Sequence, residues 1–346
     1  MIAVLSDLKH PIIQAPMAGV QGVRLAAAVC RAGALGSLPA AMLSAEQLAD
    51  SLTALHAESG GAPYNVNFFA HRTPAVSAEQ QATWLSLLQP YFDELGINPA
   101  DIAQNSGRQP FDEAALQVVE TYRPAVISFH FGLPEPKLLQ AVKATGAQVW
   151  SSATTVAEAR WLAAHGADAV IAQGWEAGGH RGWFLNHDAA RQTGTFALLP
   201  QAAGAVDIPV IAAGGISDAA GVRAAMALGA AAVQAGTAFL LADEADTRPA
   251  HRVALQSPRA EATVVTNLLS GGMARGIPNR LIDEIGAVHP AALPFPLAGT
   301  AVGLLKAAAE AKDSDDFSTF WAGQNAPLAR TGSAAQIVAR LAAGLT

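Results

Sequence analysis

The sequence predicts an α/β protein, a (β/α)8 TIM barrel with an insertion after its third strand and a C-terminal extension packed on or over the barrel. Short apolar runs rich in Val and Ile recur eight times, and each ends in Gly, Pro or a polar residue. Ala- and Glu-containing stretches with helical spacing lie between most of these runs. This alternation is typical of a parallel sheet covered by helices, and eight strands close a barrel. An open, doubly wound sheet is the alternative.

The expected strands follow one another along the first 240 residues. They lie at 11–16, 34–38, 64–69, 125–131, 148–153, 169–173, 209–213 and 232–237. Helices are expected between them, with the clearest helical spacing at Ser44–Leu55, Thr155–Ala164 and Asp218–Leu228.

Two segments do not follow the repeat. Residues 70–120 hold a helical stretch at Ala78–Phe92 and a polar loop at Asn98–Pro110, which predicts an insertion in a βα loop. The hundred residues after the eighth strand, with a final helix from about Ser333, are too many for one closing helix. We therefore expect a barrel over 1–240 and an extension or lid over 241–346 that completes the active site. The length of 346 residues also allows two domains of about 150 residues each.

Composition excludes several classes of protein. Hydrophobic residues make up 51% of the chain and charged residues 14%, which is too apolar for a disordered protein, and the formal charge of −7 disfavours nucleic-acid binding. One Cys excludes an internal disulfide framework and a Cys-rich metal site. Residues 1–14 lack the pattern of a signal peptide, and no run of about 20 apolar residues is present. The expectation is a cytoplasmic enzyme without a membrane span, either a monomer or a homodimer.

In a barrel of this kind the active site lies at the C-terminal ends of the strands. The residues that close the first six predicted strands are Gln14, Pro16, Met17, Ser37, Asn67, Phe69, Ser128, His130, Ser151, Ser152, Thr154 and Gln173. Amides, hydroxyls and imidazoles dominate this set, and carboxylates are nearly absent. Such a set suits a neutral planar ligand with polar edges better than a divalent metal ion, so no metal is expected.

The last two strands carry a phosphate-binding pattern. Ala213-Gly-Gly-Ile-Ser-Asp218 is a strand end, a glycine pair and a helix cap, and Gln234-Ala-Gly-Thr237 repeats the arrangement one strand later. Glycines allow backbone N–H groups to approach phosphate oxygens, and barrels often bind phosphate after strands seven and eight. The alternative is that both are tight turns in which only Gly fits the backbone.

His180 is the leading candidate for proton transfer. It lies in Gln173-Gly-Trp-Glu-Ala-Gly-Gly-His-Arg-Gly182, a glycine-rich loop after strand six, and imidazole titrates near neutrality. His130 shares one face of strand four with Ser128, so it either lines the pocket or satisfies a hydrogen bond in the core. The remaining histidines that we assigned to helices or turns are expected to be solvated, namely His10, His56, His165 and His251.

Three further side chains have competing interpretations. Glu176 is either a general acid or base or a brace for its own glycine loop, and we favour the brace. Arg275, in the segment Ser270–Arg280, either controls the access of anions to the pocket or lies in a surface turn. Cys30 fits buried packing in the first helix better than a nucleophile.

Together these segments resemble the nitronate monooxygenase family, formerly called 2-nitropropane dioxygenases. The matching segments are Gln14-Ala-Pro-Met17, Asn65-Val-Asn-Phe-Phe69, Ser128-Phe-His-Phe-Gly132, the glycine-rich loop that ends in Gly182, Ala213-Gly-Gly-Ile216 and Gln234-Ala-Gly-Thr237. They occur in order over residues 10–240, and Phe320-Trp-Ala-Gly-Gln324 resembles a tail motif of the nitronate-oxidising class. Two departures concern the wall on the substrate side: Met273 stands where Arg is expected, and Phe and Trp occupy tail positions where Tyr is frequent.

The resemblance implies FMN at the mouth of the barrel and His180 as the catalytic base or substrate contact. His130 is a second catalytic candidate, from its place at the end of strand four. The resemblance also implies that alkyl nitronates such as propionate 3-nitronate, with nitroalkanes as a further substrate class, are oxidised by O2 to a carbonyl compound and nitrite in a detoxifying reaction. The residues expected at the cofactor are Gln14, Met17, Asn67, Gln173, Gly178, Gly179, Gly214, Gly215, Gln234, Ala235, Gly236 and Thr237.

Three other functions remain open at the level of sequence. The nearest is an FMN barrel reductase that uses NAD(P)H to reduce a quinone or an enoyl thioester. A phosphosugar isomerase or aldolase would use the same phosphate loops without a flavin, but it predicts a Lys at a strand end, which is not found. A barrel that only binds a ligand has no feature in its favour.

Overall fold

The computed structural model describes residues 3–102 and 108–345. Eight parallel strands form a closed barrel in the order β1-β9-β8-β6-β5-β4-β3-β2. The ring closes between β1 and β2, where Ile13 and Leu35 form a parallel bridge. The barrel strands are β1 (Ile12–Gln14), β2 (Gly36–Pro39), β3 (Tyr64–Phe69), β4 (Val126–His130), β5 (Gln148–Ala153), β6 (Ala169–Gln173), β8 (Val210–Ala213) and β9 (Ala232–Ala235). All eight predicted strands and the barrel are confirmed, with ends that differ by up to two residues.

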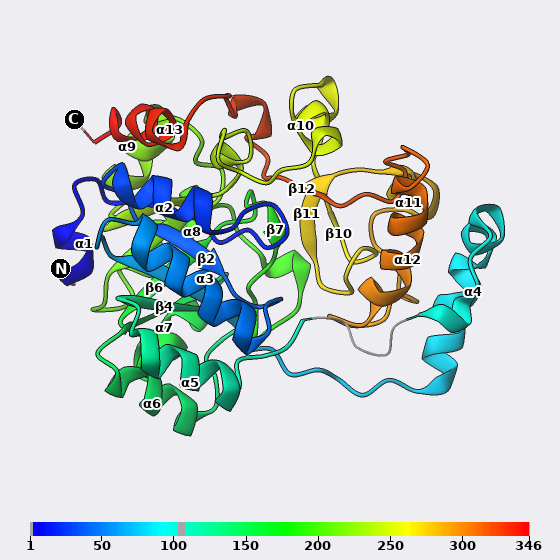
Figure 1. The fold of residues 1–346 in the computed structure, drawn as a ribbon, viewed down its shortest axis with the longest axis horizontal. Helices are drawn as coiled ribbons and strands as arrows, with labels where there is room; N and C mark the ends of the chain where they lie inside the picture. Colours follow the sequence, from blue (N-terminus) through cyan, green and yellow to red (C-terminus); the bar gives the residue numbers. More distant parts are fainter. Residues whose placement is uncertain (1–2, 103–107, 346) are drawn as a thin grey trace.

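Eight helices cover the barrel, one after each strand (Figure 1). They are α2 (Val23–Arg31), α3 (Ala45–Glu58), α5 (Glu113–Tyr122), α6 (Pro136–Ala144), α7 (Val156–Ala164), α8 (Thr195–Ala203), α9 (Ala219–Ala227) and α13 (Ala334–Ala342). The last helix begins at a capping box formed by Ser333 and Gln336. Its apolar residues, among them Ile337 and Leu341, complete the core between the strands and the outer helices. The end of the chain is therefore the eighth helix of the barrel, and α1 (Ala3–Asp7) precedes the first strand.

A second lobe lies beside the mouth of the barrel. It joins the insertion after β3 to the segment between β9 and α13, and Figure 1 shows α4 beside α11 and α12, away from the barrel helices. Its elements are α4 (Ala78–Leu95), α10 (Pro249–Leu255), β10 (Val264–Thr266), β11 (Ala274–Ile277), α11 (Arg280–Ile285), α12 (Ala298–Glu310) and β12 (Phe320–Trp321). Short 3-10 turns lie at Pro99–Asp101, Ala189–Arg191, Thr237–Phe239, Pro258–Glu261 and Ala326–Leu328.

One hydrophobic core holds the second lobe together. Trp84, Leu88 and Phe92, spaced four residues apart on α4, are buried against apolar side chains of α11 and α12. The predicted helix at Ala78–Phe92 is thus present, and it packs on the C-terminal segment. Part of the predicted polar loop, residues 103–107, lies outside the described residues.

Within the described ranges, no helix is long and apolar enough to cross a membrane.

Candidate active site

A cavity of about 300 Å³ opens at the C-terminal ends of the barrel strands, between the barrel and the second lobe. The side chains that line it follow from the alternation of a β-strand, because every second residue points into the barrel. The barrel interior is filled by an apolar layer that includes Val126, Trp150 and Ile171. Further along the same three strands the inward-facing residues are polar. The inward-facing residue nearest the C-terminal end of each strand lines the cavity. These last positions are His130, Ser152 and Gln173.

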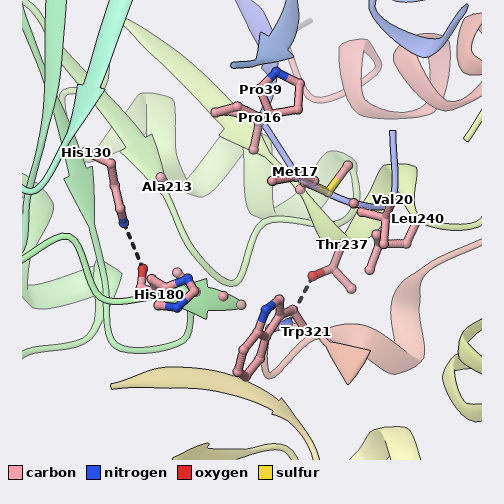
Figure 2. A pocket seen from close by; sticks show the side chains of 18 of the residues that line it. Pro16, Met17, Val20, Pro39, His130, His180, Ala213, Thr237, Leu240 and Trp321 are labelled. Atoms are coloured by element: carbon pink, nitrogen blue, oxygen red, sulfur yellow. Dashed lines mark hydrogen bonds between the residues drawn. The ribbon is translucent and has the colours of Figure 1, made fainter. Parts of the chain in front are cut away.

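Ten of the twelve predicted cofactor positions line this cavity, as do both candidate histidines, His130 and His180 (Figure 2). The ten are Met17, Asn67, Gln173, Gly178, Gly179, Gly214, Gly215, Gln234, Gly236 and Thr237. Segments that are far apart in the sequence therefore converge on one site, as the barrel rule requires.

Gln14 and Ala235 do not fit the prediction, because strand alternation turns both side chains away from the cavity. Ile13 faces the barrel interior, so Gln14 faces the outer layer, where its amide donates to Gln21 Oε1 and accepts a hydrogen bond from Ser37 N at 3.0 Å. Ala235 is 1% exposed and packs with the covering helices. Both side chains therefore lie behind the cavity wall and do not face the cavity.

His180 is held in a short strand. We expected it in a glycine-rich loop after strand six, but β7 (Gly179–His180) pairs with β11, with His180 opposite Ala274. Its Nε2 lies 2.8 Å from Oγ of Ser270, a buried serine of the second lobe. Aromatic rings surround the imidazole, with the centroids of Phe295 and Trp321 at 5.0 and 5.5 Å. The ring is therefore fixed at the junction of the two lobes.

His130 supports the backbone of His180. Its Nε2 lies 3.1 Å from the carbonyl oxygen of His180, which can only accept, so Nε2 carries the proton. Burial is the main cause that lowers the pKa of His130 to about 4, so the ring is neutral and its Nδ1 accepts a hydrogen bond from Ser152 Oγ at 2.9 Å. Gln173 Nε2 donates to the same carbonyl at 2.9 Å. These two bonds hold the backbone of His180 in place.

The imidazole of His180 is also neutral. Burial lowers its pKa well below the ordinary value of 6.5, and Arg108, His130 and His71 lower the pKa further. Ser270 Oγ donates to the Gly272 carbonyl at 3.3 Å, so it can accept a hydrogen bond from Nε2–H of His180. This arrangement leaves Nδ1 with its lone pair, as a proton acceptor requires.

The two glycine loops lie together at one end of the cavity. Gly214 and Gly215 have φ of 108° and 70°, values that favour glycine. Of the two cap candidates in this motif, Ser217 and Asp218, it is Asp218 that caps the following helix, with Gly221 N donating to its Oδ1 at 2.8 Å. After β9 the chain forms only a 3-10 turn, Thr237–Phe239.

The tail closes over these loops. Gly323 N donates to Thr237 Oγ1 at 2.9 Å, and Asn325 Nδ2 donates to the Gly215 carbonyl. The segment that follows β12 therefore touches both glycine loops, and Figure 2 shows Trp321 close to Thr237 at this end of the site.

Glu176 is a brace, as we favoured. Its carboxylate accepts hydrogen bonds from Thr195 N and Thr195 Oγ1, at the first turn of α8. Thr195 Oγ1 also lies 3.0 Å from the carbonyl oxygen of Gly214. The carboxylate of Glu176 is therefore connected, through Thr195, to the glycine loop after β8. Cys30 is buried in α2, and burial raises the pKa of its thiol to about 11.

Arg275 lies in neither of the positions that we considered. It is 3% exposed on β11, and its Nε donates to the Trp175 carbonyl at 3.1 Å. Its guanidinium stacks on the Trp175 ring, so it joins the β11 sheet to the β6 loop. His251, which we expected to be solvated, is 3% exposed and stacks on Phe320 at 5.1 Å, and burial lowers its pKa to about 4.

The second lobe adds charged and aromatic side chains to the site that were not among the predicted site residues. Arg108, Lys306 and Arg248 line the cavity and give it a positive side, while Trp321 adds an aromatic wall. Arg108 belongs to the polar loop Asn98–Pro110, which we predicted only as part of an insertion. The one feature of the sequence that could have indicated its place in the site is that it is the single basic residue of this loop. Ser270 begins the segment Ser270–Arg280, in which Arg275 was the predicted candidate and the serine is the residue that contacts His180. No group of three or more His, Cys, Asp or Glu side chains is placed to hold a metal ion anywhere in the described ranges.

Comparisons with known proteins agree with this geometry. The family model described as nitronate monooxygenase matches residues 1–344. Nitronate monooxygenase of Pseudomonas aeruginosa is 43% identical over 342 residues, which cover 97% of this chain and 96% of that protein. The protein of the same name from Paraburkholderia phytofirmans is 42% identical over 97% of this chain and 92% of its own.

Solved structures show the same fold. Nitroalkane oxidase from Streptomyces ansochromogenes superposes with a TM-score of 0.89 at 35% identity, over 99% of this chain and 98% of that chain. FabK from Thermotoga maritima matches with a TM-score of 0.71 at 29% identity, over 98% and 93% of the two chains. The family model and the full-length relatives agree, and the chain belongs to the nitronate monooxygenase family, a family of oxidoreductases.

Proposed function

We propose that this protein uses FMN to oxidise alkyl nitronates, such as propionate 3-nitronate, with O2 to a carbonyl compound and nitrite. The observation that carries the proposal is the neutral His180, fixed by Ser270 in a cavity that holds three cationic side chains. Nitronate monooxygenases depend on a flavin in general, and the polar groups of the cavity suit FMN.

The cavity wall supports the fit of a flavin mononucleotide. Gln234 Oε1 is buried, and among the described residues it has no hydrogen-bond partner, so a donor group of a ligand would satisfy it. The left-handed glycines Gly214 and Gly215 leave room for phosphate oxygens beside the backbone, and Gly236 and Thr237 face the same end of the site. Asn67 and Gln173 would hold the polar edge of the ring, with Met17 against its face.

When bound, FMN supplies the electron transfer between the nitronate and O2, which no side chain of the cavity supplies. The protein contributes position and charge. Neutral His180 can accept a proton from the carbon next to the nitro group of a nitroalkane, while Ser270 holds the ring in place. A nitronate has already lost this proton, so for that substrate His180 acts as a contact and not as a base. The aromatic rings of Phe295 and Trp321 pack against the imidazole of His180 from the side of the second lobe.

The test combines a spectrum with turnover. We expect the purified protein to show flavin absorption and to consume O2 with propionate 3-nitronate. We expect His180→Asn to lose about 10²- to 10⁴-fold of kcat on neutral nitroalkanes, the usual contribution of a general base, and much less on nitronates. His56→Asn, at an exposed position on α3, is the control. Full turnover of nitroalkanes by His180→Asn would exclude the role of a base.

An NAD(P)H-dependent flavin reductase is the second candidate function, because the FabK structure shares this fold over nearly the whole chain. The nitroalkane oxidase structure matches more closely. Anaerobic mixing with NADH separates the two candidates. Rapid bleaching of the flavin by NADH would support the reductase, whereas bleaching by a nitronate alone would support the oxidation that we propose.

A further inference from the structure

Arg181 is a buried cation that the proposed chemistry does not use. It directly follows His180 in the chain, and the residue is 0% exposed. Burial lowers the pKa of its guanidinium to about 10, so the group stays charged at neutral pH. A charge this deeply buried is costly unless hydrogen bonds satisfy it, so its partners indicate what it holds in place.

The guanidinium of Arg181 holds the end of β6. Its Nη2 donates to the carbonyl oxygen of Gln173 at 2.8 Å, and its Nη1 donates to the carbonyl oxygen of Gly174. Nη2 also donates to Gln192 Oε1 at 2.8 Å. The planar fork of an Arg reaches the carbonyls of two successive residues at once, whereas the ammonium of a Lys is a single point charge.

Gln173 holds the chain around Arg181 in return. Its side-chain Nε2 donates to the carbonyl oxygen of His180 at 2.9 Å, and its Oε1 accepts a hydrogen bond from Gly182 N at 2.8 Å. The side chain of Gln173 therefore fixes the backbone on both sides of Arg181, while the side chain of Arg181 fixes the backbone of Gln173. Adjacent side chains of an extended chain point to opposite sides, and of this pair His180 lines the cavity. An Arg181 that is fixed behind the chain therefore fixes the direction in which His180 faces.

Trp175 joins this arrangement to the second lobe. The guanidinium carbons of Arg181 and Arg275 lie 5.3 and 5.7 Å from the centroid of its ring. Arg275 donates to the carbonyl oxygens of Trp175 and Thr263, at 3.1 and 3.0 Å. The carbonyls of residues 173, 174 and 175 are thus all held by arginine side chains, and the loop that leads to His180 has a fixed course.

We propose that Arg181 is a positioning residue for His180, because it ties the end of β6 to β7 and so fixes the direction in which the imidazole meets the substrate. This inference rests on the proposed function. A neutral nitroalkane requires the imidazole within hydrogen-bond reach of the proton that it accepts. A nitronate has no such proton to lose, so its oxidation depends less on the direction of the ring.

Kinetics on the two forms of the substrate test the proposal. Arg181→Lys is the main variant, because it keeps the charge and loses the fork. A displacement of about 1 Å in an active site can cost about 10²-fold in rate, so we expect kcat on a neutral nitroalkane to fall about 10- to 100-fold. We expect kcat on the corresponding nitronate to stay within a factor of about three. Arg191→Lys is the matched control, since Arg191 lies in the connection from β7 to α8 and its side chain is 73% exposed.

A purely structural role of Arg181 gives a different result. It would lower the melting temperature and reduce the turnover of both substrates equally. That outcome would overturn the proposal, as would an unchanged kcat on the nitroalkane. If Arg181→Lys does not fold, Gln192→Ala decides, because it removes one acceptor of the guanidinium and leaves Arg181 in place. A smaller split between the two substrates is then expected, and its absence would overturn the proposal.

Hydrogen exchange tests the positioning of His180 without turnover. The N–H groups of Arg181 and Gly182 donate to the Met273 carbonyl and to Gln173 Oε1, both at 2.8 Å. In the flavin-loaded protein we expect both to exchange about 2- to 10-fold faster in Arg181→Lys than in the wild type, the effect of one weakened hydrogen bond. Unchanged exchange would overturn the proposal. If exchange rises in Arg181→Lys and the wild type oxidises neither substrate, the proposed function alone fails.

Discussion

At the scale of single residues, burial determines the protonation of the histidines around the site. His130 is neutral because burial disfavours its charged form, and the carbonyl of His180 fixes its tautomer. His71 is 8% exposed among Phe69, Phe131 and Phe295, and neither of its ring nitrogens has a hydrogen-bond partner among the described residues. Each of these buried imidazoles lowers the free energy of unfolding once the pH is low enough to protonate the same imidazole in the unfolded chain.

His71 gives a pH-dependent prediction with a definite sign. Burial is the main cause that lowers its pKa from 6.5 to about 4. Above pH 6.5 the imidazole is neutral in the folded and unfolded states. As the pH falls from 6.5 toward 4, His71 binds a proton in the unfolded chain but not in the folded chain. The contribution of His71 to the free energy of unfolding is therefore complete above pH 6.5 and falls by roughly 3 kcal/mol by pH 4.

His71→Phe should remove this pH dependence, because Phe has no nitrogen to protonate and suits the surrounding rings. We expect the fall in unfolding free energy between pH 7.5 and pH 4.5 to be smaller by about 2–3 kcal/mol in this variant than in the wild type. Urea unfolding at the two pH values measures the difference, with His56→Gln as an exposed control. If His71→Phe loses as much stability as the wild type, His71 does not titrate in this way.

At the scale of elements, prediction succeeded where the pattern is local. Each barrel strand is buried on both faces and therefore forms a short apolar run that sequence alone reveals. The apolar face of α4 was also visible, because Trp84, Leu88 and Phe92 recur at helical spacing. What covers that face was not visible, since α12 lies some two hundred residues later in the chain. For the same reason the two-residue strand β7, which orients His180, has no signature apart from its partner β11.

Gly178 tests how closely the β6 loop and the tail pack. A Cβ at this position would lie 2.5 Å from Gly323 N and 2.6 Å from the carbonyl carbon of Ala322, and both are backbone atoms that cannot rotate away. We expect Gly178→Ala to force the two segments apart, to destabilise the protein by about 1–3 kcal/mol and to weaken flavin retention. Thermal unfolding and the fraction of flavin kept after gel filtration measure both effects.

Gly303→Ala is the matched control for this substitution. Gly303 is exposed in the middle of α12, and its Cβ would meet nothing within 4 Å. Because Ala favours a helix over Gly by about 1 kcal/mol, this variant should be as stable as the wild type or more so. Equal stability of Gly178→Ala and the wild type would show that the loop and the tail separate without cost.

At the scale of the whole molecule, the tail connects the two glycine loops to the barrel. Gly323 N donates to Thr237 Oγ1 and Gln324 N donates to the Glu176 carbonyl, each at 2.9 Å. A few residues later the chain enters α13, which packs between α2 and α9 (Figure 1). A ligand that orders the glycine loops therefore also stabilises the segment that crosses them, and through it the closing helix.

Removal of the flavin should thus loosen the tail before the outer barrel. In hydrogen exchange followed by mass spectrometry, we expect residues 320–328 to exchange faster in the flavin-free protein, because the N–H groups of Gly323 and Gln324 lose part of their protection. Added FMN should restore protection and raise the melting temperature, since a ligand at about 100 times its Kd stabilises the folded state by about 2.7 kcal/mol. Helix α6, which contributes no residue to the cavity lining among the described residues, should exchange at the same rate with and without FMN. Protection that stays equal in residues 320–328 would mean that the barrel alone holds the tail, and that the glycine loops do not transmit flavin binding to it.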